Sequence, residues 1–80
     1  MMATRAGEYR GDEVRALRKS LGLRQDEAAA AWGRPASNLC QVELNRRRIS
    51  AQAYRTLVKA LERAGRARYE RERKASNERG

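Results

Sequence analysis

Short segments with helical spacing of apolar residues, separated by glycine and proline, constrain most strongly what this chain can fold into. Val14, Leu17 and Leu21 recur at intervals of three and four residues, as on one face of a helix. A second helix is expected over 25–32, where alanine is frequent and Gly33 stops the run. We find no strand signal. The sequence therefore predicts an all-α fold, a small bundle of four to five helices within 80 residues.

Two further helices are expected in the second half of the chain. Pro35 suits the first position of a helix, because its missing N–H would be unpaired there, and this helix is predicted over about 35–44. Asn45 is able to take the left-handed conformation that ends a helix. Ser50 is a suitable cap for a fourth helix, which is predicted to end near Gly65. The apolar stripe of that helix is Tyr54, Leu57, Val58 and Leu61.

The helical pattern also sets the expected domain boundaries. Residues 1–11 are polar and interrupted by glycine, so they are expected to form a flexible N-terminal arm. The packed domain is expected to span 12–65. Residues 66–80 form a basic mixed-charge tail with hardly any apolar face. A frayed or disordered tail is the first expectation, and an exposed continuation of the helix is the alternative.

The charge of the chain points to a polyanionic partner. It carries 19 Lys and Arg against 10 Asp and Glu, a net charge of +9 at pH 7. Nucleic acid is the commonest polyanion that such an excess attracts. A ribosomal-type protein and a merely soluble basic protein remain as alternatives on charge alone.

Residues suited to catalysis or metal binding do not stand out. The chain has no His and a single cysteine, Cys40, which excludes a Cys/His zinc site and an internal disulfide framework. No convergent carboxylate pair is evident, so we expect no enzyme, no cofactor and no metal. No apolar run reaches membrane-spanning length and no signal-peptide core precedes the domain. A cytoplasmic protein without a membrane partner is therefore expected.

Two short helices joined by a tight glycine turn, the second rich in polar residues, describe a helix-turn-helix. The segment LRKSLGLRQDEAAAAWGRPASNLCQVELNRRRIS resembles the phage Cro and lambda-repressor-like family of helix-turn-helix DNA-binding domains. The resemblance covers about residues 12–65. The pieces that carry it occur in order as Leu17-Arg18, Leu21-Gly22-Leu23, Gln25, Ala29, Gly33, Leu39 and Val42-Glu43.

The resemblance implies a recognition helix over about 35–44 that lies in the major groove of DNA. The residues implied to face base edges, or to lie beside them, are Ala36, Ser37, Asn38 and Gln41. Gln41 is the strongest candidate, because its amide can pair bidentately with adenine.

The resemblance further implies phosphate contacts and one internal ion pair. Gln25 corresponds to a glutamine that binds a DNA phosphate in the family. Arg24 stands where the family has a Ser or Thr cap, and its cation is expected to bind a phosphate instead. The loop residues implied to hold phosphates are Arg46, Arg47 and Arg48. Arg18 and Glu43 are implied to pair, tying the first helix to the third, although an exposed Glu43 is the alternative.

The sequence therefore leads us to expect a sequence-specific double-stranded DNA-binding transcriptional regulator. The resemblance implies a homodimer that represses by occupying an inverted-repeat operator, with half-sites ~34–36 Å apart. Activation through contact of Asp26 and Glu27 with RNA polymerase stays open. Two other classes also stay open: a nonspecific basic nucleic-acid-binding protein, and an antitoxin-type interaction module that uses residues 66–80.

Overall fold

The computed structural model describes the backbone of residues 7–79 and the side chains of residues 7–75. Its four helices are α1 (Gly11–Ser20), α2 (Gln25–Trp32), α3 (Ala36–Glu43) and α4 (Ala51–Arg79). Within these described residues the only β-structure is an isolated bridge. The predicted all-α fold class is therefore confirmed. No helix in this part of the chain combines the length and apolarity needed to cross a membrane.

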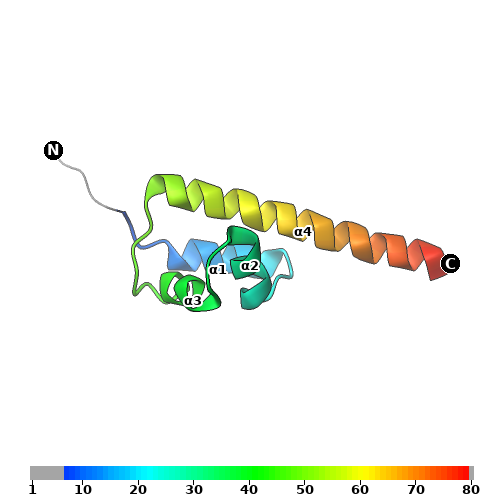
Figure 1. Cartoon of the computed structure of the whole chain (residues 1–80), viewed down its shortest axis with the longest axis horizontal. Helices are drawn as coiled ribbons and strands as arrows, with labels where there is room; N and C mark the ends of the chain where they lie inside the picture. Colours follow the sequence, from blue (N-terminus) through cyan, green and yellow to red (C-terminus); the bar gives the residue numbers. More distant parts are fainter. Residues whose placement is uncertain (1–6, 80) are drawn as a thin grey trace.

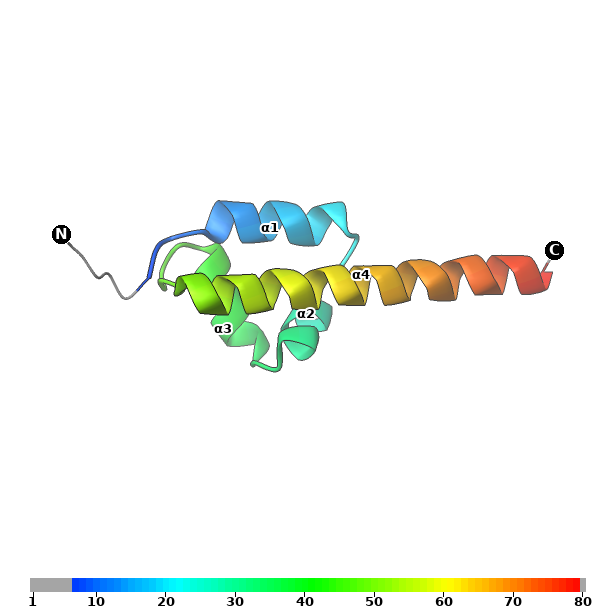
Figure 2. The same cartoon turned by 90° about the horizontal axis from the view of Figure 1, so that it is seen from above.

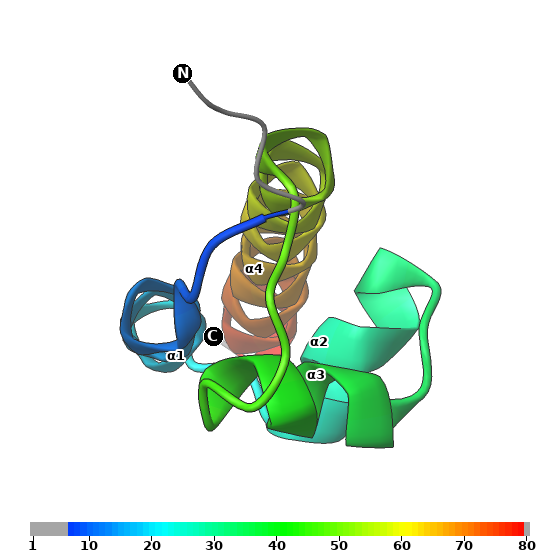
Figure 3. The same ribbon diagram turned by 90° about the vertical axis from the view of Figure 1, so that its left-hand side faces the viewer.

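The long helix α4 lies along α1 and α2, while α3 lies on the other side of the bundle from it (Figures 1 and 3). All four helices contribute to one core beneath α4. The largest fully buried side chains are Leu39, Leu57, Leu61, Val14 and Val42. Helix α3 contacts α1 and α2, while Ala36 and Ser37 at its start remain exposed to solvent.

The ends of α2 and α3 follow the glycine and proline positions with small differences from expectation. Gly33 ends α2 with φ +81°, the left-handed conformation that glycine adopts without strain. Pro35 precedes α3 with φ −62° and ψ 150°, so it is not the first helical residue as predicted. An extended ψ at Pro35 lets the chain turn sharply before α3 begins at Ala36. Asn45 has φ +59°, as its predicted role after α3 requires.

The expectation of a flexible N-terminal arm is wrong for residues 7–11, while residues 1–6 lie outside the described residues. Glu8 and Ile49 exchange two backbone hydrogen bonds, of 3.0 and 2.9 Å. Gly7 permits this close approach, since a Cβ there would lie 2.7 Å from the Ile49 backbone. Gly11 is already the first residue of α1, and its N–H donates to Asn45 Oδ1 at 2.9 Å.

The expected end of the fourth helix near Gly65 is also wrong, because α4 continues to Arg79 (Figure 2). Gly65 is buried against Leu21, and a Cβ there would lie 3.0 Å from the Leu21 side chain. Glycine therefore serves close packing at this position and does not stop the helix. Arg68 then anchors the next turn by donating to the Gly22 carbonyl and pairing with Glu27 at 3.2 Å.

Candidate nucleic-acid interface

Uncharged side chains are exposed along α3 from its first turn to the residue after its end. Leu39, Val42 and Glu43 are buried, with exposed fractions of 0, 1 and 3%. Helix α3 carries all four residues predicted to lie at base edges. Of these, Ala36 and Ser37 are exposed, whereas Asn38 and Gln41 are half-buried. We call the outward line through Ser37, Gln41 and Leu44 the α3 ridge, and Leu44 at its end is 49% exposed.

The α3 ridge carries no charge. The only ionisable carboxylate on α3 is Glu43, and it is buried. By contrast, the first turn of α1 carries Asp12 and Glu13, and the first turn of α2 carries Asp26 and Glu27. An approaching polyanion therefore meets no like charge along α3, although carboxylates are present on the neighbouring helices.

Arg18 neutralises Glu43 from α1. Its Nε donates to Oε2 at 2.7 Å and a terminal nitrogen donates to Oε1 at 3.0 Å. The other terminal nitrogen donates to the Leu23 carbonyl at 3.0 Å. The hydrogen bond to Glu43 and the charge of that carboxylate raise the pKa of Arg18 above its usual value. The pair joins α1 to the last turn of α3 and so fixes the direction in which the ridge points.

The two predicted phosphate-binding residues at the start of α2 are already engaged within the protein. Gln25 Nε2 donates to Glu43 Oε1 at 3.1 Å, so Gln25 shares the buried carboxylate with Arg18. Arg24 is exposed, and its Nε lies 3.3 Å from Asp26 Oδ1. The N–H of Arg24 donates to Glu27 Oε1 at 2.8 Å, and the Glu27 N–H, which a Ser or Thr cap would accept, donates to Asp26 Oδ1 at 3.0 Å.

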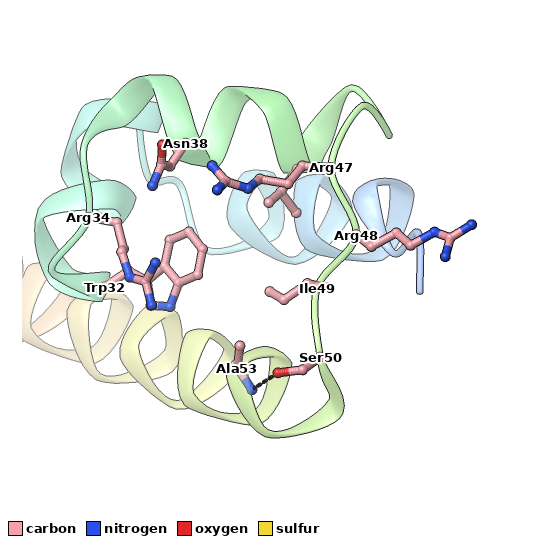
Figure 4. A pocket seen from close by; sticks show the side chains of 9 residues that line it. Trp32, Arg34, Asn38, Arg47, Arg48, Ile49, Ser50 and Ala53 are labelled. Atoms are coloured by element: carbon pink, nitrogen blue, oxygen red, sulfur yellow. Dashed lines mark hydrogen bonds between the residues drawn. The ribbon is translucent and has the colours of Figure 1, made fainter. Parts of the chain in front are cut away.

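A hollow of about 90 Å³ lies on one flank of the α3 ridge, between the α2–α3 turn and the loop before α4 (Figure 4). We call it the Trp32 hollow. It is lined by Trp32, Arg34, Asn38, Val42, Arg47, Arg48, Ile49, Ser50 and Ala53. The lining contains three arginines and no carboxylate. The Arg34 guanidinium lies over the Trp32 ring, 5.3 Å from its centroid, at the mouth of this hollow.

The three loop arginines that were predicted to hold phosphates point in different directions. Arg47 extends toward Asn38 and the Trp32 hollow, whereas Arg48 points away from it (Figure 4). Arg48 instead lies over the ring of Tyr9, at 5.3 Å from the centroid. Arg46 is exposed, and its backbone N–H donates to the Gln41 carbonyl at 2.9 Å. The structure thus directs the side chain of Arg47, and not that of Arg48, toward a side chain of α3 (Figure 4).

A second hollow, of about 260 Å³, lies on the other flank of the ridge, between α1 and α3. It is lined by Arg15, Arg18, Lys19, Gln25, Cys40, Glu43 and Leu44. Its single carboxylate is the one that Arg18 neutralises, so Arg15 and Lys19 leave the opening positively charged. The α3 ridge therefore runs between two cationic hollows.

Sequence reasoning did not single out Arg15, Lys19 or Arg34 as site residues. Arg15 and Lys19 are four residues apart, a spacing that places them on one face of α1, and this signal was available. Arg34 had no comparable signal, because its relation to Arg47 depends on how the two loops fold.

Comparison with protein-family models, with curated proteins and with solved structures found no match for this chain.

Proposed function

We propose that this protein is a sequence-specific double-stranded DNA-binding transcriptional regulator, with α2 and α3 forming a helix-turn-helix. The observation that carries the proposal is the uncharged α3 ridge between two cationic hollows. A major groove is about 12 Å wide and admits one α-helix, and it is bounded on both sides by phosphates. An uncharged ridge that enters the groove, with a cationic hollow facing the phosphates on each side, is complementary to this distribution of charge.

In this proposal the α3 ridge reads bases and its surroundings bind the backbone. Gln41 is the principal base-reading residue, because a side-chain amide can both donate to and accept from adenine. Ser37 contacts a second base with less discrimination, and Ala36 is small enough to meet a thymine methyl group. Phosphate contacts come from the cations on the two flanks and position the helix without reading sequence.

We further propose that the protein acts as a homodimer on an inverted repeat and represses by occupying promoter DNA. One α3 touches few base pairs, and two copies joined by a twofold axis would place their ridges ~34–36 Å apart. Sedimentation at micromolar concentration tests this point. A monomer both with and without operator DNA contradicts the dimer and leaves the DNA-binding proposal intact.

Fluorescence anisotropy tests the main proposal. The protein is titrated into labelled duplexes from its own upstream region and into scrambled duplexes of equal length, at roughly 150 mM salt. A preference of ~10³-fold or more is expected for a specific regulator. If the upstream duplex shows none, selection from random DNA is applied, and failure to enrich any sequence contradicts specific recognition.

The net charge favours one second candidate, a nonspecific nucleic-acid-binding protein. With +9 overall, charge alone could drive association with any duplex. The two candidates differ in the anisotropy experiment: the nonspecific protein shows a steep salt dependence that is the same for every sequence. An interaction module that uses residues 66–80 is tested separately by deleting these residues. A deletion that leaves all binding intact contradicts that function.

A further inference from the structure

Two arginines from separate loops face the same hollow. Arg34 lies in the turn between α2 and α3, and Arg47 lies in the loop between α3 and α4. Both line the Trp32 hollow: Arg47 extends toward Asn38 from the loop after α3, and Arg34 lies beside Trp32 (Figure 4). Two guanidinium groups that line one hollow give it a positive potential, which favours an anion there.

Nothing among the described residues supplies that anion. The lining of the Trp32 hollow contains no Asp or Glu. The ion pairs found in residues 7–75 involve other arginines, namely Arg10, Arg18, Arg24 and Arg68. The wider opening beside the hollow is lined by Trp32, Arg34, Ser50, Gln52, Ala53 and Thr56, again without a carboxylate.

Trp32 holds Arg34 in a geometry suited to an anion. The guanidinium lies over the indole ring, 5.3 Å from its centroid, and such cation–π contacts position an arginine while leaving its N–H groups free at the edges. Val42, Ile49 and Ala53 add apolar surface to the lining, which strengthens electrostatic attraction to a bound ion.

The size of the hollow admits a phosphate group. Each water needs about 10–15 Å³ of such space, so a hollow of about 90 Å³ holds several waters. This is ample room for one phosphate group. Asn38 at the rim offers an amide that can donate to an oxyanion.

We infer that the Trp32 hollow binds one phosphate group through Arg34 and Arg47, with Trp32 holding Arg34 in place. The inference rests on the proposed function for its preferred source, the backbone of the DNA duplex beside the α3 ridge. A free phosphate compound is the other source of the same chemistry. Arg34 and Trp32 thereby join the interface, although the sequence pattern assigned neither to it.

The salt dependence of duplex binding tests the inference. Arg34→Gln and Arg47→Gln are compared with Arg63→Gln, which removes the same charge from an exposed position on α4 outside both hollows. Each contact with one phosphate contributes about 0.9 to the slope of log affinity against log salt. We expect the salt slope to fall by about this amount in Arg34→Gln and in Arg47→Gln, and to be unchanged in Arg63→Gln. Equal slopes for all three variants overturn the inference.

Fluorescence of Trp32 supplies a second readout, because it is the only tryptophan in the chain. Duplex binding should change its emission in the wild type and in Arg63→Gln, and should change it much less in Arg34→Gln. Titration with inorganic phosphate and pyrophosphate forms a separate arm. A saturable change there that needs Arg34 supports a free-phosphate source, and no change with either duplex or free phosphate overturns the inference.

These measurements separate the inference from the proposed function. The slopes are measured on any duplex, so they report on the hollow whether or not one sequence is preferred. If no sequence is preferred, the proposal of specific recognition is contradicted. A salt slope that is reduced only in Arg34→Gln and Arg47→Gln still supports the phosphate site. Melting temperatures of the three variants are measured first, and values close to the wild type are expected, since all three side chains are exposed.

Discussion

Arg18 of α1 holds Glu43 of α3 with two parallel hydrogen bonds, of 2.7 and 3.0 Å, in a site where the Glu43 side chain is 3% exposed. Such a forked pair has a defined geometry as well as a favourable energy. Its desolvation cancels much of the attraction, so its main effect is on orientation. The pair sets how α3 lies against α1, and through this it sets where the α3 ridge points.

Removal of Glu43 alone should destabilise the protein severely. Glu43→Ala leaves Arg18 partly buried without its partner, and such changes cost about 3–5 kcal/mol. Urea unfolding measures the loss. The double variant Arg18→Leu/Glu43→Leu should lose much less than the sum of the single changes, because no unpaired charge remains. A Glu43→Ala protein as stable as the wild type contradicts this view of the pair.

Gln41→Ala should reduce affinity for the preferred DNA site by about 1–3 kcal/mol and change binding to scrambled DNA little. The reason is that a base contact is lost while the backbone contacts remain. Ser20→Ala, which changes an exposed polar residue at the end of α1 outside both hollows, is the control. If Gln41→Ala weakens specific and scrambled binding equally, Gln41 does not read a base.

Gly11→Ala should destabilise the fold by about 1–3 kcal/mol, the usual cost of forcing extra volume into a packed site. A Cβ at Gly11 would overlap the Val42 carbonyl oxygen and lie 2.6 Å from Asn45 Oδ1. These atoms belong to the end of α3 and the residues after it, so they cannot move independently. Asp12→Ala, one residue later and exposed, should change the urea midpoint far less.

Arg68→Ala should lower the free energy of unfolding by about 1 kcal/mol, because hydrogen bonds between α4, the Gly22 carbonyl and Glu27 are lost. Arg66→Ala removes an exposed arginine from the same stretch of α4 and is the control. Equal urea midpoints for the two variants would show that Arg68 does not anchor α4.

Tyr54 should ionise at a higher pH than a free tyrosine. Burial, together with the neighbouring Glu13 carboxylate, raises its pKa above 10. The neutral form is therefore the one favoured by folding, so this contribution to stability is complete below pH 10 and is lost as pH rises through the higher folded pKa. The difference in absorbance at 295 nm between the wild type and Tyr54→Phe measures this titration, and a midpoint at or below 10 contradicts it.

The sequence allowed good prediction where local chemistry determines the structure. Gly33 and Pro35 were sufficient to locate the turn between α2 and α3, and the apolar spacing identified the sides of α1 and α4 that face the core. The docking of residues 7–11 could not be predicted, because it depends on a backbone approach to Ile49 far along the chain. No periodic pattern encodes such a contact.

The continuation of α4 also escaped prediction for a physical reason. Its residues beyond Gly65 have almost no apolar face, and composition alone favours disorder. Helix formation there is supported by the contact of Arg68 with Gly22, 46 residues away in the chain, and by its pair with Glu72 one turn later. The meeting of Arg34 and Arg47 at one hollow is likewise a property of the folded loops.

The straight course of α4 has a practical consequence for work with the protein. The stretch 66–79, at about 1.5 Å per residue, is roughly 20 Å long, and it leads away from the bundle along the molecule's long axis (Figures 1 and 2). A dye or an affinity handle attached near Arg79 is therefore carried on a stiff spacer well clear of α3. Surface immobilisation through that end should leave the ridge accessible to ligands in solution.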